Sequence, residues 1–127
     1  MTAPRRAAFA GTAAAVVLAA CAPAPITPDT PRVVRDQVVA PYDVREVCLR
    51  AAPGERIEFA FEASDPVDFS LHYRDGNGIV TPIVRAGSRG DAGYYAPRFA
   101  DDYCLSWEAG ASGAFIDYRI GLSRERF

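Results

Sequence analysis

Two neighbouring stretches of this chain alternate strictly between apolar and polar residues. Residues 56–62 read RIEFAFE and residues 67–74 read VDFSLHYR, so apolar side chains recur at every second position. A period of two places those side chains on one face of an extended strand and the polar ones on the other. The chain is therefore expected to bury one face of each strand and to build its core from β-structure.

Turn-forming residues separate the apolar runs. Residues 75–78 (DGNG) are the strongest hairpin signal, because Gly and Asn readily adopt positive φ. Asp65–Pro66 is expected to break the alternation, Gly87–Gly93 to form a polar loop, and Asp101–Asp102 to form a turn. The last residues, 123–127, are expected to fray. The strands expected between these signals cover residues 33–39, 44–49, 56–62, 67–74, 79–85, 94–99, 103–107 and 114–122.

The fold class follows from this spacing. The stretches after residue 21 lack a sustained 3.6-residue apolar stripe, which an amphipathic helix would need. About seven or eight short strands separated by Gly, Pro and Asp turns are typical of a small antiparallel β-sandwich. A small closed barrel is the alternative.

The first twenty residues have the features of a targeting segment. Arg5 and Arg6 precede an uncharged apolar run from Ala7 to Ala20. That run is shorter than the roughly 20 residues that a spanning helix needs, and it suits the apolar region of a secretory signal.

The end of this segment, Leu18-Ala19-Ala20-Cys21, resembles the lipobox of bacterial lipoproteins. The resemblance implies that the Cys21 thiol is diacylated and that the chain is cut before Cys21. In lipoproteins of didermal bacteria an Asp after the Cys often signals inner-membrane retention. Ala22 therefore implies the outer membrane, facing the periplasm, or the cell membrane where no outer membrane exists. The alternative is an ordinary secretory signal that is cleaved near Ala20.

The chain thus divides into a signal peptide (1–20), the lipidated Cys21 with a Pro-rich tether (21–32), and a β-domain (33–127). Four prolines within residues 22–31 favour an extended, semi-rigid tether that packs no core. Removal of the signal leaves 12 arginines against 16 carboxylates and no lysine. A mildly acidic domain without a basic run is a poor nucleic-acid binder, and it depends on the lipid for membrane attachment.

Two cysteines remain after Cys21, at positions 48 and 104. Disulfides form in exported compartments, so Cys48 and Cys104 are predicted to form one bridge. Two buried free thiols are the alternative. The cysteines lack Cys-x-x-Cys spacing, so the pattern indicates neither a zinc ribbon nor a thioredoxin site.

The order of these features is similar to the GOLD-type β-sandwich of a family of eukaryotic cargo adaptors, which also occurs in scattered bacterial proteins. The features are Cys48 followed by a Gly turn and an alternating strand, then Val67–Leu71, a Gly hairpin, and Asp102–Trp107 with Cys104 in its middle. The resemblance covers about residues 44–122. It implies the fold and the disulfide, and for function only a generic binding role. The family often has Gly where this chain has Asp101.

Residues that carry chemistry are sparse. His72 is the single histidine, on the polar side of an expected strand, and it is interpreted as a solvated residue or as a ligand-contacting or pH-sensing group. The Asp75–Gly78 segment fails the EF-hand pattern, because Ile79, Val80 and Ala86 occupy its fifth, sixth and twelfth positions. No catalytic residues, metal or cofactor are therefore predicted, and the chain is not expected to be an enzyme.

The late part of the chain is rich in aromatic residues. Trp107 is expected in the core, whereas Tyr94 and Tyr95 adjoin the Gly-rich segment. Together with Arg89, Arg98 and His72 they form the expected binding surface. The sequence thus favours a lipid-anchored, non-catalytic envelope module that binds an envelope protein or a small ligand. The alternatives are an inhibitor or escort of an envelope enzyme and, last, an unrecognised enzyme.

Overall fold

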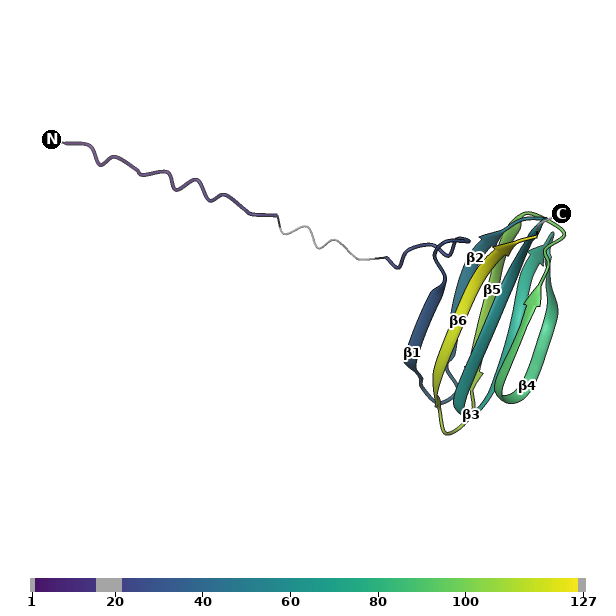
Figure 1. Cartoon of the computed structure of the whole chain (residues 1–127). Helices are drawn as coiled ribbons and strands as arrows, with labels where there is room; N and C mark the ends of the chain where they lie inside the picture. Colours follow the sequence, from purple (N-terminus) through teal and green to yellow (C-terminus); the bar gives the residue numbers. More distant parts are fainter. Residues whose placement is uncertain (1, 16–21, 126–127) are drawn as a thin grey trace.

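The structure is a computed structural model that describes residues 2–15 and 22–125. Residues 2–15 form an exposed segment without regular structure, which leads toward the domain in Figure 1. Cys21 and the residues before it that resemble a lipobox lie outside the described residues, so lipidation stays a prediction. None of the described residues belongs to a helix long and apolar enough to cross a membrane.

The described part of the domain is all-β and contains six strands. They are β1 (Arg32–Val39), β2 (Val44–Ala51), β3 (Glu55–Asp75), β4 (Gly78–Tyr95), β5 (Asp101–Ala109) and β6 (Ala114–Arg124). Every pairing is antiparallel. The all-β, antiparallel class is confirmed. The expected seven or eight strands become six, because two of the expected breaks, at Asp65–Pro66 and at Gly87–Gly93, are absent.

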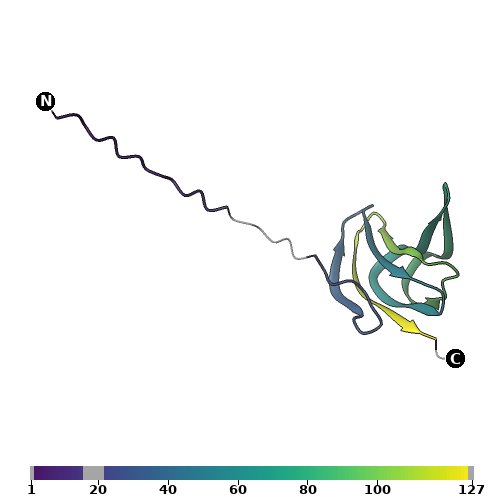
Figure 2. The ribbon, with the colours of Figure 1, turned by 90° about the horizontal axis from the view of Figure 1, so that it is seen from above.

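The long strand β3 organises the sheet. Its first half, up to Ala63, pairs with β6, and its second half, from Val67, pairs with β5. Strand β4 follows β3 along its other edge, while β1 extends the β6 half and β2 extends the β5 half. The sheet therefore bends along β3 and curls into a half-barrel, which is seen from above in Figure 2.

The expected break at Asp65–Pro66 is wrong for the strand. The alternating burial set by Phe61 continues through Asp65 to Val67, so β3 runs unbroken. What changes at this point is the partner strand, and the register with β4 shifts between Glu62 and Val67. Proline has no amide hydrogen to donate. The change of partner leaves Pro66 outside the ladders to β5 and β6, so it removes no hydrogen bond from either.

The expected loop at Gly87–Gly93 is also wrong, because it lies within β4. This strand pairs on one side with β3, and most of its residues are exposed. A strand at a sheet edge buries little, so its composition is close to that of a loop. Arg85 and Asp91 pair with core-facing positions of β3 and form an ion pair of 2.9 Å. Charges on the inner side of an edge strand protect it against pairing with another chain.

Two smaller expectations also fail. Asp101–Asp102 begins β5 rather than forming a turn, because both residues pair with β2. Strand β6 continues to Arg124, and Glu125 donates its amide hydrogen to the Gly54 oxygen at 2.8 Å. Residues up to 125 are therefore fixed to the domain, while residues 126–127 lie outside the described part.

The core lies on the inner side of the curl. Trp107, Phe69, Ile57 and Tyr103 are among its fully buried side chains, which confirms the expectation for Trp107. The centroid of the Phe69 ring lies 4.8 Å from that of Phe61 and 5.5 Å from that of Trp107. Such tilted aromatic contacts stabilise beyond the area they bury.

The Pro-rich segment contributes one residue to this core. Ile26 is buried with the β-strand residues, and the segment turns back through two hydrogen bonds between Thr27 and Thr30. Arg32 also donates to the Ala24 oxygen at 2.8 Å. The expectation that this segment packs no core is therefore wrong at Ile26.

Candidate functional site

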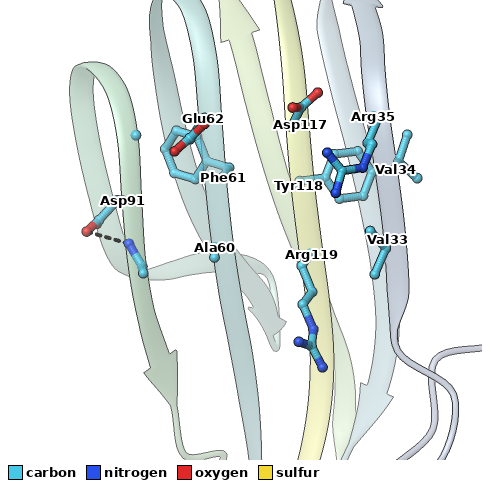
Figure 3. A pocket seen from close by; sticks show the side chains of 12 residues that line it. Val33, Val34, Arg35, Ala60, Phe61, Glu62, Asp91, Asp117, Tyr118 and Arg119 are labelled. Carbon is cyan, nitrogen blue, oxygen red and sulfur yellow. Dashed lines mark hydrogen bonds between the residues drawn. The ribbon is translucent and has the colours of Figure 1, made fainter.

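A shallow hollow crosses the outer face of the half of the sheet that contains β1, β6, β3 and β4. Its volume is about 650 Å³, and Figure 3 shows the four strands side by side beneath it. A second hollow of about 500 Å³ adjoins it and shares Ala60, Ala92 and Arg119 with it. We call the two together the outer trough.

The trough exists because small residues meet across neighbouring strands. Ala60 of β3 pairs with Ala92 of β4, and Glu62 pairs with Gly90. Gly121 of β6 lies opposite Glu58. Over a continuous area, alanine and glycine thus occupy positions where longer side chains would normally stand. The surface is hollowed there.

Charged side chains stand around the trough. In Figure 3 the carboxylates of Glu62 and Asp117 lie toward one end, and the Arg119 guanidinium extends toward the other. Asp117 is held in place because its Oδ1 accepts the amide hydrogen of Asp36 at 2.7 Å. Asp36 has a φ of 53°, within the irregularity of β1 between Val34 and Gln37, which turns its amide toward β6.

An aromatic ring closes the far end of the trough. Tyr94 is 55% exposed, and the Arg56 guanidinium carbon lies 4.2 Å from the centre of its ring. Ser123 donates a hydrogen bond to Glu58 at 3.0 Å on the same rim. The trough therefore offers a ring, carboxylates and guanidinium groups along an open strip, which suits binding of an extended polar ligand.

The five residues of the expected binding surface do not form one site. Tyr94 lines the trough, whereas Arg89 and Arg98 are exposed outside it. Tyr95 points to the opposite side of β4, and its ring lies 5.7 Å from that of the buried Tyr103. His72 lies on the second half of β3 and does not line the trough.

Tyr95 belongs to a cluster of three tyrosines at the edge of the core. Burial raises the pKa of Tyr95, and the neighbouring Tyr73 raises it further. Burial also raises the pKa of Tyr103, whose hydroxyl donates to the Phe99 oxygen at 2.6 Å. These contacts are those of a packed cluster that fixes the β4–β5 connection.

The other half of the sheet carries the disulfide on its outer face. Cys48 of β2 and Cys104 of β5 lie directly opposite each other and are bonded, which confirms the predicted bridge. His72 of β3 lies opposite Cys104 on the other side. Its Nε2 is 3.7 Å from a carboxylate oxygen of Glu46, which lies two residues before Cys48. We call these four residues the disulfide cluster.

Sequence reasoning missed most of the trough. Glu58 and Glu62 were placed correctly on the polar face of their strand, but nothing distinguished them from ordinary solvated residues. Small residues at outward positions, such as Ala60, were the available signal. It became meaningful only with the register that brings Ala60 beside Ala92.

No protein-family model matches this chain, and no curated protein matches it at a significant level. Function is therefore inferred from the geometry of the domain itself.

Proposed function

We propose that this protein is a lipid-anchored, non-catalytic module of the cell envelope that binds a partner protein along the outer trough. The anchor follows from the resemblance of Leu18–Cys21 to a lipobox. The bound segment is an extended polypeptide of mixed charge. The ring, carboxylate and guanidinium groups are spread along a strip. They therefore complement the polar side chains of an extended polypeptide better than they complement a compact ligand.

The observation that carries the binding role is the continuous line of small residues across the strands. Ala60, Gly90 and Ala92 leave the sheet surface accessible between Glu62 and Arg119. Solubility alone does not require small residues to be aligned across neighbouring strands. Here the charges border a strip that is left open.

The sandwich assignment belongs to the same proposal. The two halves of the bent sheet face each other across the core, as the two sheets of a sandwich do. We infer that the domain is a six-stranded variant of the GOLD-type sandwich, with β3 and β4 passing from one layer to the other. Such a module is compatible with a binding role and does not define its partner.

Photo-cross-linking in cells tests this proposal. The chain has no lysine, so amine-reactive reagents cannot report on the domain surface. A photoreactive amino acid is placed instead at Ala92, inside the trough, and in a second strain at Glu108, which is exposed on the other half of the sheet. The Ala92 probe is expected to capture one discrete protein that the Glu108 probe does not.

A pair of substitutions then separates the trough from the rest of the surface. Ala60→Arg fills the trough, whereas Ala111→Arg adds the same side chain to an exposed turn. The first should abolish the cross-link at position 92 and the second should leave it intact. Equal capture from positions 92 and 108, or a cross-link that survives Ala60→Arg in a folded chain, would contradict the proposal.

A further inference from the structure

The disulfide cluster brings together more than the bond itself. Cys48, Cys104 and His72 lie in one row across β2, β5 and β3, since Cys104 pairs with Cys48 on one side and with His72 on the other. Glu46 is on the same outward face of β2 as Cys48, two residues away. Three neighbouring strands thus present two sulfurs, an imidazole and a carboxylate on one patch of surface.

The distances within this patch are short. One atom each of Glu46, His72 and Cys104 lie within 4.8 Å of one another. The second Glu46 oxygen, Oε1, is 3.3 Å from the Cys48 sulfur. A disulfide sulfur has no proton to donate, so this is a contact and not a hydrogen bond. It shows that the carboxylate already reaches both the sulfur pair and the imidazole.

Solvent also reaches the patch. The side chains of His72 and Glu46 are 22% and 48% exposed, and Cys48 is exposed as well. An exposed disulfide is accessible to thiol reductants, and exposed bonds are among the more easily reduced ones. Both the reductant and an ion can therefore enter from solvent without opening the core.

We propose that reduction of the Cys48–Cys104 bond creates a zinc site with four protein ligands: the two thiolates, the His72 imidazole and the Glu46 carboxylate. Zinc binds sulfur, imidazole nitrogen and carboxylate oxygen, and protein sites that supply four such ligands are tetrahedral. Rotation of the two cysteine side chains moves the released sulfurs apart to admit the ion. The bridge and the metal site are alternative states of the same residues.

The chemistry balances with a dithiol as the reductant. The dithiol transfers two electrons and two protons to the Cys48–Cys104 bond, which becomes two thiols while the dithiol becomes a disulfide. Zinc then displaces one proton from each thiol, so two protons are released per ion bound. In the oxidised state the sulfurs carry no negative charge, and the remaining imidazole and carboxylate are too few for a closed site.

The test uses the full chain with Cys21→Ser in every sample, so that Cys48 and Cys104 are its only thiols. The oxidised chain and the chain reduced with a phosphine are titrated with zinc against a chromophoric chelator. Cobalt is then substituted for zinc, because thiolate-to-cobalt charge transfer reports directly on sulfur ligation. We expect one ion per reduced chain, with thiolate absorption, and no binding at that affinity to the oxidised chain.

Two variants test the remaining ligands, and a third serves as the control. His72→Ala and Glu46→Gln should each weaken zinc binding by roughly tenfold or more, since even the loss of a supporting group costs that much. Glu108→Gln is the matched control, because Glu108 is exposed on the outer face of β5 and belongs to neither the cluster nor the trough. It should bind zinc as the parent does.

Every outcome decides for or against the site. A reduced, folded chain that binds no zinc overturns it, and so do His72→Ala and Glu46→Gln variants that bind as tightly as the control. If reduction unfolds the domain, recovery of the β-sheet circular dichroism on addition of zinc supports the site, because binding is then linked to folding. Failure of zinc to restore that signal overturns it.

Discussion

Trp107 of β5 stacks on Tyr118 of β6, with ring centroids 4.8 Å apart and ring planes 23° apart. These two strands pair with different halves of β3, so the stack joins the two halves of the bent sheet through side chains. Trp107 is fully buried. We expect Trp107→Ala to lower the free energy of unfolding by about 3–5 kcal/mol, as measured by urea denaturation.

Trp107→Phe is the informative companion. The indole nitrogen of Trp107 is buried without a hydrogen-bond partner among the described residues. Removing this nitrogen therefore offsets part of the stability that the protein loses when the ring becomes smaller. The Phe variant should therefore lose clearly less stability than the Ala variant. Equal losses would show that the indole volume, and not the stacked ring, is what the core requires.

The Cys48–Cys104 bridge links residues that are 56 positions apart in sequence. On the chain-entropy model a loop of this length is worth about 4 kcal/mol. Cys48→Ala with Cys104→Ala should therefore lower the melting temperature markedly, by roughly 4–8 °C for each kcal/mol lost. Reductant should lower the parent similarly and leave the double variant unchanged. A parent that melts identically with and without reductant would contradict the expectation.

Two glycines in the β5–β6 turn form a matched pair. Gly113 has a φ of 65°, and a Cβ there would lie 2.8 Å from the Val39 oxygen, whereas a Cβ on Gly110 would meet open space. The left-handed conformation alone costs a non-glycine residue roughly 1–2 kcal/mol. Gly113→Ala should thus lose at least that much stability in urea denaturation, and Gly110→Ala should stay close to the parent. The reverse order would show that the turn rearranges.

Features that depend on the alternation of residues or on the type of a single residue could be predicted from the sequence. Features that depend on which strands are neighbours could not. Alternation located the buried face of β3, and export chemistry with a residual cysteine pair predicted the bridge. The break at Pro66 was wrong because a proline interrupts a strand only where a neighbour needs its amide, and the neighbour changes there. The Gly87–Gly93 segment was misread because an edge strand has nearly the composition of a loop. The trough required the pairing of Ala60 with Ala92, which no local pattern contains.

The tyrosine cluster makes the stability of the domain depend on pH in the alkaline range. Burial raises the pKa of both Tyr95 and Tyr103, and the unfolded chain keeps a value near 10. The folded state therefore holds these protons more tightly. The resulting stabilisation of the folded state is fully present below about pH 10 and is lost as the pH rises through the folded pKa values.

Urea denaturation at a series of pH values measures this effect. Tyr103→Phe should be less stable at neutral pH, because it loses the 2.6 Å hydrogen bond to Phe99, and its stability should fall less steeply above pH 10. A slope above pH 10 that is the same in Tyr103→Phe and in the parent would assign the alkaline loss to other groups.

The membrane attachment is predicted to depend on Cys21 alone. The domain has more carboxylates than arginines, and it has no lysine, so its charge gives little attraction to anionic head groups. Two or more acyl chains provide a stable anchor, whereas a single chain holds a protein only reversibly. Cys21→Ser should therefore move the protein from the membrane to the soluble fraction, with Ala22→Ser as the neighbouring control that stays membrane-bound. A Cys21→Ser chain that still sediments with membranes, and is extracted only by detergent, would mean that the apolar run from Ala7 to Ala20 is retained as the anchor instead.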